Sequence, residues 1–505
     1  MSEIALANRS VSLLWLLDGI ATIPATAVRV DDLTLDSREV RPGSLFCALR
    51  GHARHGLQFA LQAAERGASA VLWESAPGIA PPALPASVYA APVPGLEALM
   101  GRIADRMFDW PSAQLRIFGI TGTNGKTTCA YLLAQSLERL GSRAAYVGTL
   151  GWGSIAALAA QPLTTPDVAS VHRTLARLRA GGVRDVAIEV SSHALAQNRV
   201  AGVRFHSAAF TNLSRDHLDY HGSMEAYGKA KARLLDCGDL RQIIINVGDA
   251  YGRELAQAYG GRVPLTAVWV GAGGSGWLAQ RTVHAAAVES LARGLSLQLD
   301  GTCGRAALQS KLIGRFNAEN LLVVLGCLVS LGVPLAAAAA ALAQCAAPPG
   351  RMEVIAARDA RKALVVIDYA HTPDALAKVL GALREHCGGA LWCVFGCGGD
   401  RDAGKRPLMG AAADDLADRI IVTDDNPRSE DPARITHDIG LGIRAHTVRI
   451  IHDRAQAIAT ALGEAAAADI VLIAGKGHET YQVYGTQRRE FSDHREALRH
   501  LGEAA

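Results

Sequence analysis

The stretch RIFGITGTNGKTT at residues 116–128 constrains the fold of this chain most strongly. Residues 116–120 are mostly apolar and bounded by turn residues, which predicts a short buried β-strand. A glycine-containing loop at residues 122–125 follows, and we predict a helix from Lys126 to about Arg139. Because N–H groups at a helix N-terminus face a bound anion, this order predicts a phosphate cradle. Lys126 would add a mobile positive charge, and the Thr127 hydroxyl can hold Mg²⁺.

The match to the general P-loop pattern is incomplete. That pattern places a first glycine four residues before the Gly-Lys pair. Here position 120 is Ile, and Gly119 comes one residue early. The alternative is an ordinary strand-to-helix turn. The order of strand, loop, lysine and paired threonines favours the phosphate site.

Composition excludes several classes of protein. A chain of 505 residues predicts about three or four domains. The net charge of +3 gives no global field for nucleic acid. The nine cysteines include no C-x-x-C pair, which favours reduced thiols in a cytosolic protein over zinc or disulfides. The apolar residues 13–23 are too short to span a bilayer and contain Asp18, so we expect no membrane insertion.

Alternation of predicted strands and helices indicates an α/β protein of three domains, with boundaries at 1–112, 113–348 and 349–505. The first is small, with expected strands at residues 28–35 and 45–49. The second carries the P-loop on a mostly parallel sheet, with antiparallel strands within residues 262–312. The third is doubly wound and follows a stiff hinge at residues 348–353.

Polar side chains follow several strands of the predicted central sheet. Glu189 ends the strand at residues 185–190, and His217 lies in the polar segment after the strand at residues 207–210. Ligands of open α/β sheets bind beyond the carboxyl ends of the strands. We therefore expect Glu189 and His217 to lie beside Thr127 as Mg²⁺ ligands. On the predicted helix 223–237, the basic residues are Lys229, Lys231 and Arg233, and their pattern is typical of a solvated face.

The third domain has a comparable row of polar strand ends. Expected strands at residues 364–367, 391–395, 419–423 and 470–474 each run into a polar segment. These segments predict a second ligand face. We expect that face to close onto the first across a hinge near Gly350.

Nine short motifs in order resemble the Mur ligase family over about residues 35–480. They are GTNGKTT, EVSSH, TNLSRDHLDYH, FNAEN, PGRME, DYAHTP, GCGGDRD, DNPR and GKGHE. The resemblance implies a cytoplasmic, ATP-dependent acid–amino-acid ligase of peptidoglycan precursor synthesis, with Mg²⁺ as cofactor. A carboxylate would attack ATP to give an acyl phosphate, which an incoming amine would then displace. The DNPR motif resembles the form that takes meso-diaminopimelate.

The resemblance assigns roles to matching positions. Catalytic roles would fall on Lys126, Lys231 and His217. ATP would be bound by Gly122, Thr123, Asn124, Gly125, Lys126, Thr127, Thr128, Asn320, Arg351 and Asp368. UDP-N-acetylmuramoyl-L-alanyl-D-glutamate would be bound by Ser37, His52, Ala53, Arg54, Thr164, Thr165, Ser191, Gln197 and Arg199. Metal ligands would be Thr127, Glu189, His217 and Lys231, the last as a carbamate (N6-carboxylysine). The meso-diaminopimelate pocket would contain Arg401, Asp425, Asn426, Pro427, Arg428, Gly475 and Glu479.

Three alternatives stay open at this point. An enzyme of the same family could add L-lysine in place of diaminopimelate. A folylpolyglutamate-synthetase-like ligase would share the P-loop and the hinge, but we would not expect it to carry DNPR together with GKGHE. A nucleotide-binding module without enzymatic activity would need the P-loop but not the second polar face. For the enzyme we expect a monomer.

Overall fold

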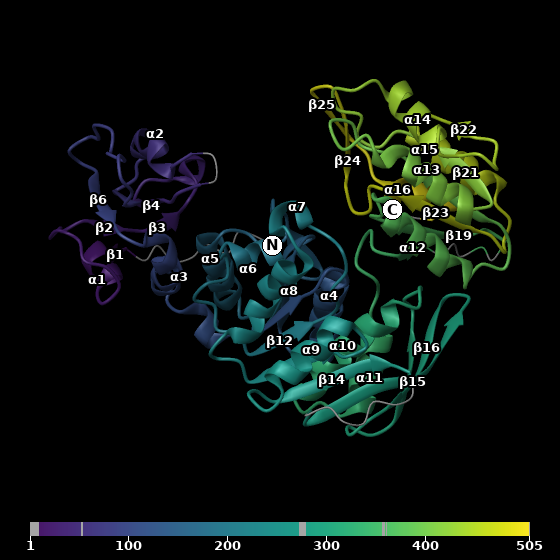
Figure 1. Cartoon of the computed structure of the whole chain (residues 1–505), viewed down its shortest axis with the longest axis horizontal. Coiled ribbons are helices and arrows are strands. Elements are labelled where there is room, and N and C mark those ends of the chain that lie inside the picture. Colours follow the sequence, from purple (N-terminus) through teal and green to yellow (C-terminus); the bar gives the residue numbers. More distant parts are fainter. Residues whose placement is uncertain (1–9, 52–53, 272–278, 356–358, 360, 504–505) are drawn as a thin grey trace. The chain divides into compact units, whose positions relative to one another are not determined.

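The computed structural model describes residues 10–51, 54–271, 279–355, 359 and 361–503 (Figure 1). The chain forms two compact units. The first runs to Ala267 and includes Gln280, and the second begins at Val268 and continues from Arg281 to the end of the described chain. The division falls within β14 (Leu265–Val270).

A four-stranded parallel sheet forms the N-terminal part of the first unit, drawn in purple and blue in Figure 1. Its strands are β3 (Asp32–Thr34), β4 (Ser44–Ala48), β5 (Ala70–Glu74) and β6 (Tyr89–Val93). Leu45 and Cys47 join one buried cluster, which includes α3 (Leu96–Met107), while Phe46 and Ala48 join another, which includes α2 (Ala60–Glu65). Burial on both faces explains why residues 45–48 of β4 are all apolar.

The single strand predicted at residues 28–35 is wrong. The segment divides at Asp31 into β2 (Arg29–Val30) and β3, which belong to different sheets. β2 pairs antiparallel with β1 (Val11–Ser12), directly before α1 (Leu13–Leu17). The Asp31 N–H donates to the Gly43 carbonyl at 2.8 Å, a tertiary contact that no local pattern reveals.

The central sheet places the P-loop strand in its middle. Five parallel strands follow the order β8 (Ala144–Gly148), β11 (Asp185–Glu189), β7 (Arg116–Thr121), β12 (Ser207–Phe210) and β13 (Gln242–Asn246). The predicted strands of this region agree with these bounds to within a residue. The carboxyl ends of β11, β7 and β12 are therefore neighbours, as expected from the sequence.

The remaining elements of the first unit extend this sheet, as β9 (Gly151–Ser154) and β10 (Ala157–Ala159) do beyond β8, or lie beside it. α4 (Lys126–Arg139) packs on β8 and β11, and Asp167 caps α5 (Val168–Ala180) by accepting from the N–H groups of Ala169 and Ser170. The others are α6 (Ser192–Ala196), α7 (Leu218–His221), α8 (Met224–Ala232) and α9 (Ala250–Tyr259). The helix predicted over 223–237 thus ends at Ala232, where a 3₁₀ turn follows.

The second unit begins with the predicted antiparallel strands, β15 (Arg281–Leu291), β16 (Gly294–Asp300) and β17 (Ala306–Ser310). Two helices pack on them, α10 (Asn317–Ser330) on β15 and α11 (Leu335–Ala343) on β17. The polar residues Asn317 and Asn320 lie on the first turn of α10.

A six-stranded sheet forms the C-terminal part of the second unit, drawn in green and yellow in Figure 1. Its order is β18 (Glu353–Ile355), β19 (Leu364–Asp368), β23 (Ile470–Ala474), β20 (Leu391–Phe395), β21 (Arg419–Val422) and β22 (Arg449–Ile450). Only β18 runs antiparallel among these pairs. A hairpin follows, of β24 (Tyr481–Tyr484) and β25 (Gln487–Glu490).

Helices cover both faces of this sheet. The core on one face takes side chains from α12 (Pro373–Arg384), α13 (Lys405–Leu416) and α14 (Pro432–Gly440), and that on the other from α15 (Arg454–Glu464) and α16 (Asp493–Leu501). Thr372 with Pro373 and Asp431 with Pro432 start α12 and α14 by a side-chain cap and a proline in the first turn. The predicted fold class is therefore confirmed, while the three domain boundaries stay a prediction.

A fully buried ion pair joins α15 to the C-terminal helix. Arg454 donates to both carboxylate oxygens of Asp493, at 2.7 and 2.8 Å, and to the carbonyl of Ala474 at 3.0 Å. Removing one partner of a buried pair leaves a buried charge uncompensated, whereas replacing both with apolar groups is tolerated better.

We expect Arg454→Met to lower the free energy of unfolding by about 3–5 kcal/mol, and Arg454→Met with Asp493→Leu to recover much of that loss. Urea denaturation of the full chain measures both effects. Lys378→Met, in the exposed pair with Asp374, is the matched control and should change stability by less than about 1 kcal/mol. An Arg454→Met midpoint equal to that of the wild type would contradict this expectation.

Candidate active site

The loop after β7 has the geometry of a phosphate cradle. Gly125 has φ +83° and directly precedes α4, and Gly122 has φ +150°. A Cβ on Gly122 would lie 1.9 Å from Thr211 Oγ1, so no other residue fits there. Lys126 Nζ donates to the carbonyls of Gly122 at 3.0 Å and Thr123 at 2.8 Å, so its charge lies over the loop. Loop, helix terminus and ammonium together can hold a phosphate chain.

The segment after β12 supports this loop. Thr211 Oγ1 donates to the Asn124 carbonyl at 2.6 Å, and the Asn124 N–H donates to Asn212 Oδ1 at 2.9 Å. The Thr123 N–H donates to the Asn212 carbonyl at 2.8 Å. Neighbouring strand ends thus converge on the P-loop, as the sequence predicted. Thr128 follows Thr127 in the first turn of α4.

Thr127 and Glu189 come together at the helix start. Thr127 Oγ1 donates to Glu189 Oε2 at 2.8 Å, and Glu189 is fully buried. Tyr146, itself fully buried, donates through its hydroxyl to Glu189 Oε1, which also accepts from the Thr149 N–H at 2.9 Å. The carboxylate is therefore held in one orientation. Sequence reasoning missed Tyr146, because a tyrosine within an apolar strand gives no local sign of a polar partner.

Thr127 and Glu189 fit a Mg²⁺ site, because both offer the oxygen ligands that this ion prefers. Among the described residues, no group of three or more His, Cys, Asp or Glu side chains is placed to hold a metal ion. Mg²⁺ characteristically uses one or two protein side chains together with phosphate oxygens and waters. Two oxygen-bearing side chains beside a phosphate cradle satisfy that requirement.

His217 lies in a histidine cluster. Its backbone has φ +50°, and its half-exposed ring lies 4.9 Å from the ring of His193, between ring centroids. His221 Nε2 lies 3.0 Å from Ser192 Oγ in the same cluster. Burial, followed by the neighbouring His217, lowers the pKa of His193. The structure gives no direct contact that joins His217 to Thr127 or Glu189.

Lys231 is buried, so the solvated basic face predicted for this helix is wrong at that position. Only 1% of Lys231 is exposed, whereas Lys229 is exposed and pairs with Glu225. Lys231 Nζ donates to the Gly122 carbonyl at 2.7 Å and lies 4.3 Å from the centre of the Tyr227 ring. Burial, reinforced by the charge of Lys126, lowers the pKa of Lys231 to about 6. The tertiary fold thus brings a largely neutral amine to the P-loop.

A second cluster in the first unit contains four of the residues predicted to bind the UDP-muramoyl dipeptide, namely Thr165, Ser191, Gln197 and Arg199. Thr165 Oγ1 donates to the Glu189 carbonyl at 2.8 Å and accepts from the Ser191 N–H at 3.2 Å. Arg199 donates to the Thr165 carbonyl at 2.9 Å and to Gln197 Oε1. Thr164 Oγ1 lies 3.1 Å from Thr149 Oγ1, next to the Glu189 site.

The predicted uridine-binding residues lie in the N-terminal part. Ser37 is buried in a 3₁₀ turn capped by Asp36, and its hydroxyl donates to Gln62 at 2.7 Å. Arg54 is exposed, and its carbonyl accepts from the Gly51 N–H at 3.0 Å. His52 and Ala53 lie outside the described residues.

Three further residues predicted to bind nucleotide lie in the second unit. Asn320 is buried and donates to Asn317 at 2.8 Å. Asp368 accepts from the N–H groups of Met352 and Ala370, both at 2.8 Å. Burial raises the pKa of Asp368, and the nearby Arg351 opposes that shift. The Arg351 guanidinium lies 4.8 Å from the centre of the Tyr369 ring.

Four polar strand ends meet at one edge of the C-terminal sheet, as predicted, because β19, β23, β20 and β21 are adjacent and parallel. Asp425 and Asn426 follow β21, and Lys476 and Glu479 follow β23. Asn426 Nδ2 donates to Glu479 Oε2 at 2.9 Å. Gly475 has φ +110°, and a Cβ there would lie 2.8 Å from Asp425 Oδ2.

Arg428 lies beside this cluster, in a left-handed backbone conformation with φ +54°. Its guanidinium donates to the Gly399 carbonyl at 2.7 Å, and its N–H donates to the Val483 carbonyl at 2.9 Å. The side chains of Asp425 and Asn426 contact Lys476 and Glu479. Arg401 is exposed near Gly398, and Pro427 is buried.

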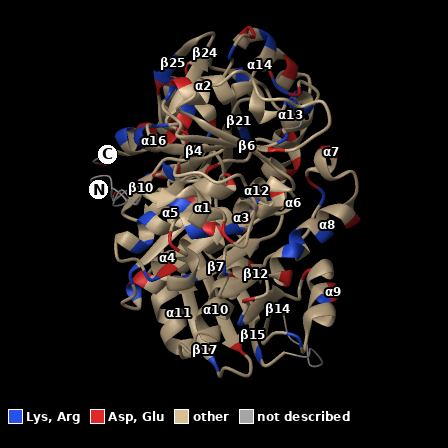
Figure 2. Cartoon of the chain, turned by 90° about the vertical axis from the view of Figure 1, so that its left-hand side faces the viewer, with Lys and Arg blue, Asp and Glu red and all other residues tan. Residues whose placement is uncertain are grey.

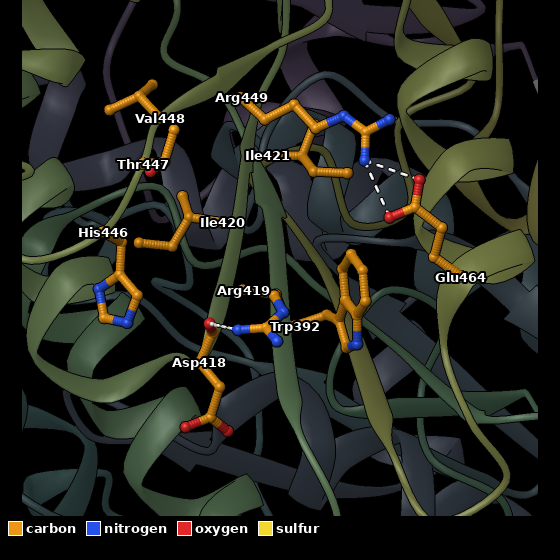
Figure 3. Close-up of a pocket in the computed structure, with 10 residues that line it drawn as sticks. All are labelled: Trp392, Asp418, Arg419, Ile420, Ile421, His446, Thr447, Val448, Arg449 and Glu464. Carbon is orange, nitrogen blue, oxygen red and sulfur yellow. Dashed lines mark hydrogen bonds and ion pairs between the residues drawn. The ribbon is translucent and has the colours of Figure 1, made fainter.

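A cavity of about 450 Å³ lies in the C-terminal part of the second unit, between the β20–β21–β22 edge of the sheet and α15 (Figure 3). Its lining includes Arg419 and Asp418 at the amino end of β21, opposite to the polar strand ends. Arg449 donates to both oxygens of Glu464, and His446 lies 2.8 Å from Asp414. We assign the cavity no role in the chemistry, because it lies at the opposite end of β21 from the polar strand ends.

No described helix has the length and apolar character needed to span a membrane. Lys and Arg are interspersed with Asp and Glu along helices such as α8 and α14 (Figure 2). This distribution agrees with the small net charge of +3.

Comparison with known proteins identifies the class. The Mur ligase middle domain matches residues 120–328, the Mur ligase glutamate ligase domain matches residues 350–477, and the Mur ligase family catalytic domain matches residues 29–107. The chain belongs to the Mur ligase family, and it is an ATP-dependent ligase that forms amide bonds.

Similar proteins carry one specific name, UDP-N-acetylmuramoyl-L-alanyl-D-glutamate–2,6-diaminopimelate ligase. That of Ectopseudomonas mendocina is 49% identical, covering 93% of this chain and 94% of its own. That of Pseudomonas aeruginosa is 47% identical, covering 94% and 95%. A solved structure with this name has a TM-score of 0.70 and 36% identity, covering 98% of this chain and 99% of its own. The Mycobacterium tuberculosis folylpolyglutamate synthase structure, at 18% identity and TM-score 0.58, shares the fold.

Proposed function

We propose that this enzyme adds meso-diaminopimelate to UDP-N-acetylmuramoyl-L-alanyl-D-glutamate in peptidoglycan precursor synthesis, with hydrolysis of ATP to ADP and phosphate. The observation that carries the proposal is the name shared by relatives of 44–49% identity over more than nine-tenths of the chain. The polar edge that contains Asn426, Arg428 and Glu479 supports the choice of a diamino acid with a second carboxylate. We further propose a cytoplasmic location and a monomer.

The first step would activate the substrate carboxylate. A carboxylate oxygen of the dipeptide attacks the γ-phosphorus of ATP, the bond to the β-phosphate oxygen breaks, and an acyl phosphate and ADP form. Lys126 would neutralise phosphate oxygens from the helix N-terminus. Bound Mg²⁺ would supply further neutralisation of charge, held by Thr127 and Glu189. His217 is proposed as an additional ligand on the strength of the family resemblance.

The second step would form the amide bond. The amine of meso-diaminopimelate attacks the acyl carbon, loses a proton and expels phosphate. Thr164, Thr165, Ser191, Gln197 and Arg199 would hold the acyl substrate beside the P-loop, where Thr165 and Arg199 already contact each other. No protein nucleophile is required, so positioning and electrostatics supply the catalysis.

An assay of the purified full chain tests the function. Phosphate release should require UDP-N-acetylmuramoyl-L-alanyl-D-glutamate, ATP and meso-diaminopimelate together. L-Lysine tests the first alternative, and a folate with glutamate tests the folylpolyglutamate-synthetase-like activity. Turnover with either of these, and none with diaminopimelate, would overturn the proposal.

We expect Lys231 to carry a carbamate. Its amine would attack CO₂, forming an N–C bond with loss of one proton, and the new anionic oxygens would suit Mg²⁺. Its burial and its pKa of about 6 support this chemistry, because the amine is mostly neutral at pH 7. We expect Lys231→Ala to lower kcat by about 10²-fold or more. Lys229→Ala is the matched control on the same helix and should leave kcat unchanged.

Carbon-13 NMR of wild type in labelled bicarbonate would detect the carbamate directly. CO₂-depleted buffer should lower activity, and added bicarbonate should restore it. An absent label, together with crystallographic density that ends at the Lys231 Nζ atom, would contradict this prediction.

A further inference from the structure

Lys476 is a fully buried cation at the polar edge of the C-terminal sheet. Its Nζ lies 3.1 Å from Glu479 Oε2, 3.3 Å from Asn426 Oδ1 and 3.5 Å from Asp425 Oδ1. These partners come from two separate strand ends, after β21 and after β23. Burying a lysine costs folding free energy unless its charge is paired. The three contacts together therefore hold Lys476 in its position.

The contacts of the Glu479 carboxylate fall on one of its two oxygens, Oε2. Lys476 Nζ and Asn426 Nδ2 both donate to Oε2, at 3.1 and 2.9 Å. Within the described part of the chain, no hydrogen bond reaches Oε1, and the Glu479 side chain is 20% exposed. A carboxylate can accept several hydrogen bonds, so Oε1 is free to accept from a ligand.

The backbone on each side of Lys476 supports this arrangement. Gly475 has φ +110° and Gly477 has φ +54°. A Cβ on Gly477 would lie 2.8 Å from the Tyr369 Cβ atom, so the turn is closely packed. Two glycines in conformations that side chains rarely adopt thus turn the intervening lysine inward.

The charges of this group favour a cationic ligand. Asp425 and Glu479 contribute two carboxylates, and Lys476 supplies one ammonium between them. One negative charge of the group is left over. An ammonium placed on Glu479 Oε1 would neutralise it in a site partly shielded from water, where such hydrogen bonds are strong.

We propose that Lys476 is a positioning residue for the amino-acid substrate. It fixes Glu479 through Oε2 and aligns Asn426, so that Oε1 receives the ammonium at the far end of the diamino acid. This role rests on the proposed function, because it requires that a diamino acid binds at this edge. Lys476 itself contacts no substrate atom. Its removal therefore acts on amino-acid binding through Glu479, and not on the activation of the acyl substrate.

The test compares KM values in the full-length enzyme. Lys476→Met should raise KM for meso-diaminopimelate at least about tenfold, because Glu479 loses a charge-assisted hydrogen bond and faces Asp425 without a counter-charge. KM for ATP and for the UDP-linked dipeptide should stay within about twofold. Lys476→Gln keeps N–H donors without the charge and should give an intermediate KM. Lys378→Met, on the exposed face of α12, is the control.

Equal increases in all three KM values, or a fall in kcat alone, would overturn the proposal, and so would an unchanged KM for diaminopimelate. A crystal structure of the wild type with meso-diaminopimelate tests the same geometry without any variant. It should show the far ammonium on Oε1 while Lys476 stays on Oε2. An ammonium on Oε2, or a displaced Lys476, would overturn it. Failure of the proposed function differs from these outcomes, because wild type would then show no turnover with diaminopimelate.

Discussion

Lys126→Ala is expected to reduce kcat/KM of the ligase by about 10³-fold or more while the protein stays folded. Lys126 is the first residue of α4, and its ammonium lies over the carbonyls of Gly122 and Thr123 in the P-loop. In the proposed reaction it would neutralise negative charge on the transferred phosphoryl group. Removing one preorganised charge or donor of this kind typically costs two to three orders of magnitude or more.

The fold should tolerate this substitution. Two hydrogen bonds of Lys126 go to carbonyls of its own loop, and alanine is a strong helix former at a helix start. Lys229→Ala removes an equal charge from the exposed face of α8 and should leave kcat/KM within about twofold. Steady-state kinetics with all three substrates, together with thermal unfolding curves, would check both variants. Near-normal turnover in a folded Lys126→Ala enzyme would refute the P-loop assignment.

Arg428→Ala is expected to abolish the preference for meso-diaminopimelate over L-lysine. Diaminopimelate carries a carboxylate and an ammonium at its far end, whereas lysine carries only the amine. A planar guanidinium can hold that carboxylate with two hydrogen bonds. When L-lysine binds to the wild type, it offers no second carboxylate, so the Arg428 guanidinium is left without its partner. We therefore expect kcat/KM to favour diaminopimelate by a factor on the order of hundreds or more.

The structure places Arg428 firmly enough for this role. Its backbone is tied to the hairpin through the Val483 carbonyl in β24 and the N–H of Gly485 in the following turn, and its guanidinium is tied to the Gly399 carbonyl. Arg428→Lys keeps the positive charge but lacks the planar guanidinium that can donate two parallel hydrogen bonds. Compared with Arg428→Ala, it should recover only part of the selectivity. Arg434→Ala, at an exposed position of α14, is the arginine control.

The measurement is the ratio of kcat/KM for the two amino acids in each variant. A wild type that uses both equally, or an Arg428→Ala enzyme with an unchanged ratio, would contradict the specificity argument. The ligase assignment would stand in either case, because it depends on the P-loop and on the comparisons with known proteins.

The sequence by itself determined the main parallel strands and the sheet edges where polar side chains gather. Apolar runs, glycines and helix caps are local signals, which is why β7, β12 and β20 and the start of α4 agree with prediction. Parallel strands end at one edge, so the neighbouring positions of Asp368, Asp425 and Gly475 could be predicted in the same way. These conclusions require only the periodicity of the chain and the geometry of a parallel sheet.

Only the tertiary structure decided which polar side chains are buried and what they contact. The spacing of Lys231 on its helix is that of a solvated residue, yet packing buries it against Tyr227 and the P-loop. Lys476 lies between two strand ends that are about fifty residues apart in the chain, with Asn426 as its partner. Burial, pKa shifts and hydrogen-bond partners depend on distances between segments remote in sequence, and no local pattern encodes such distances.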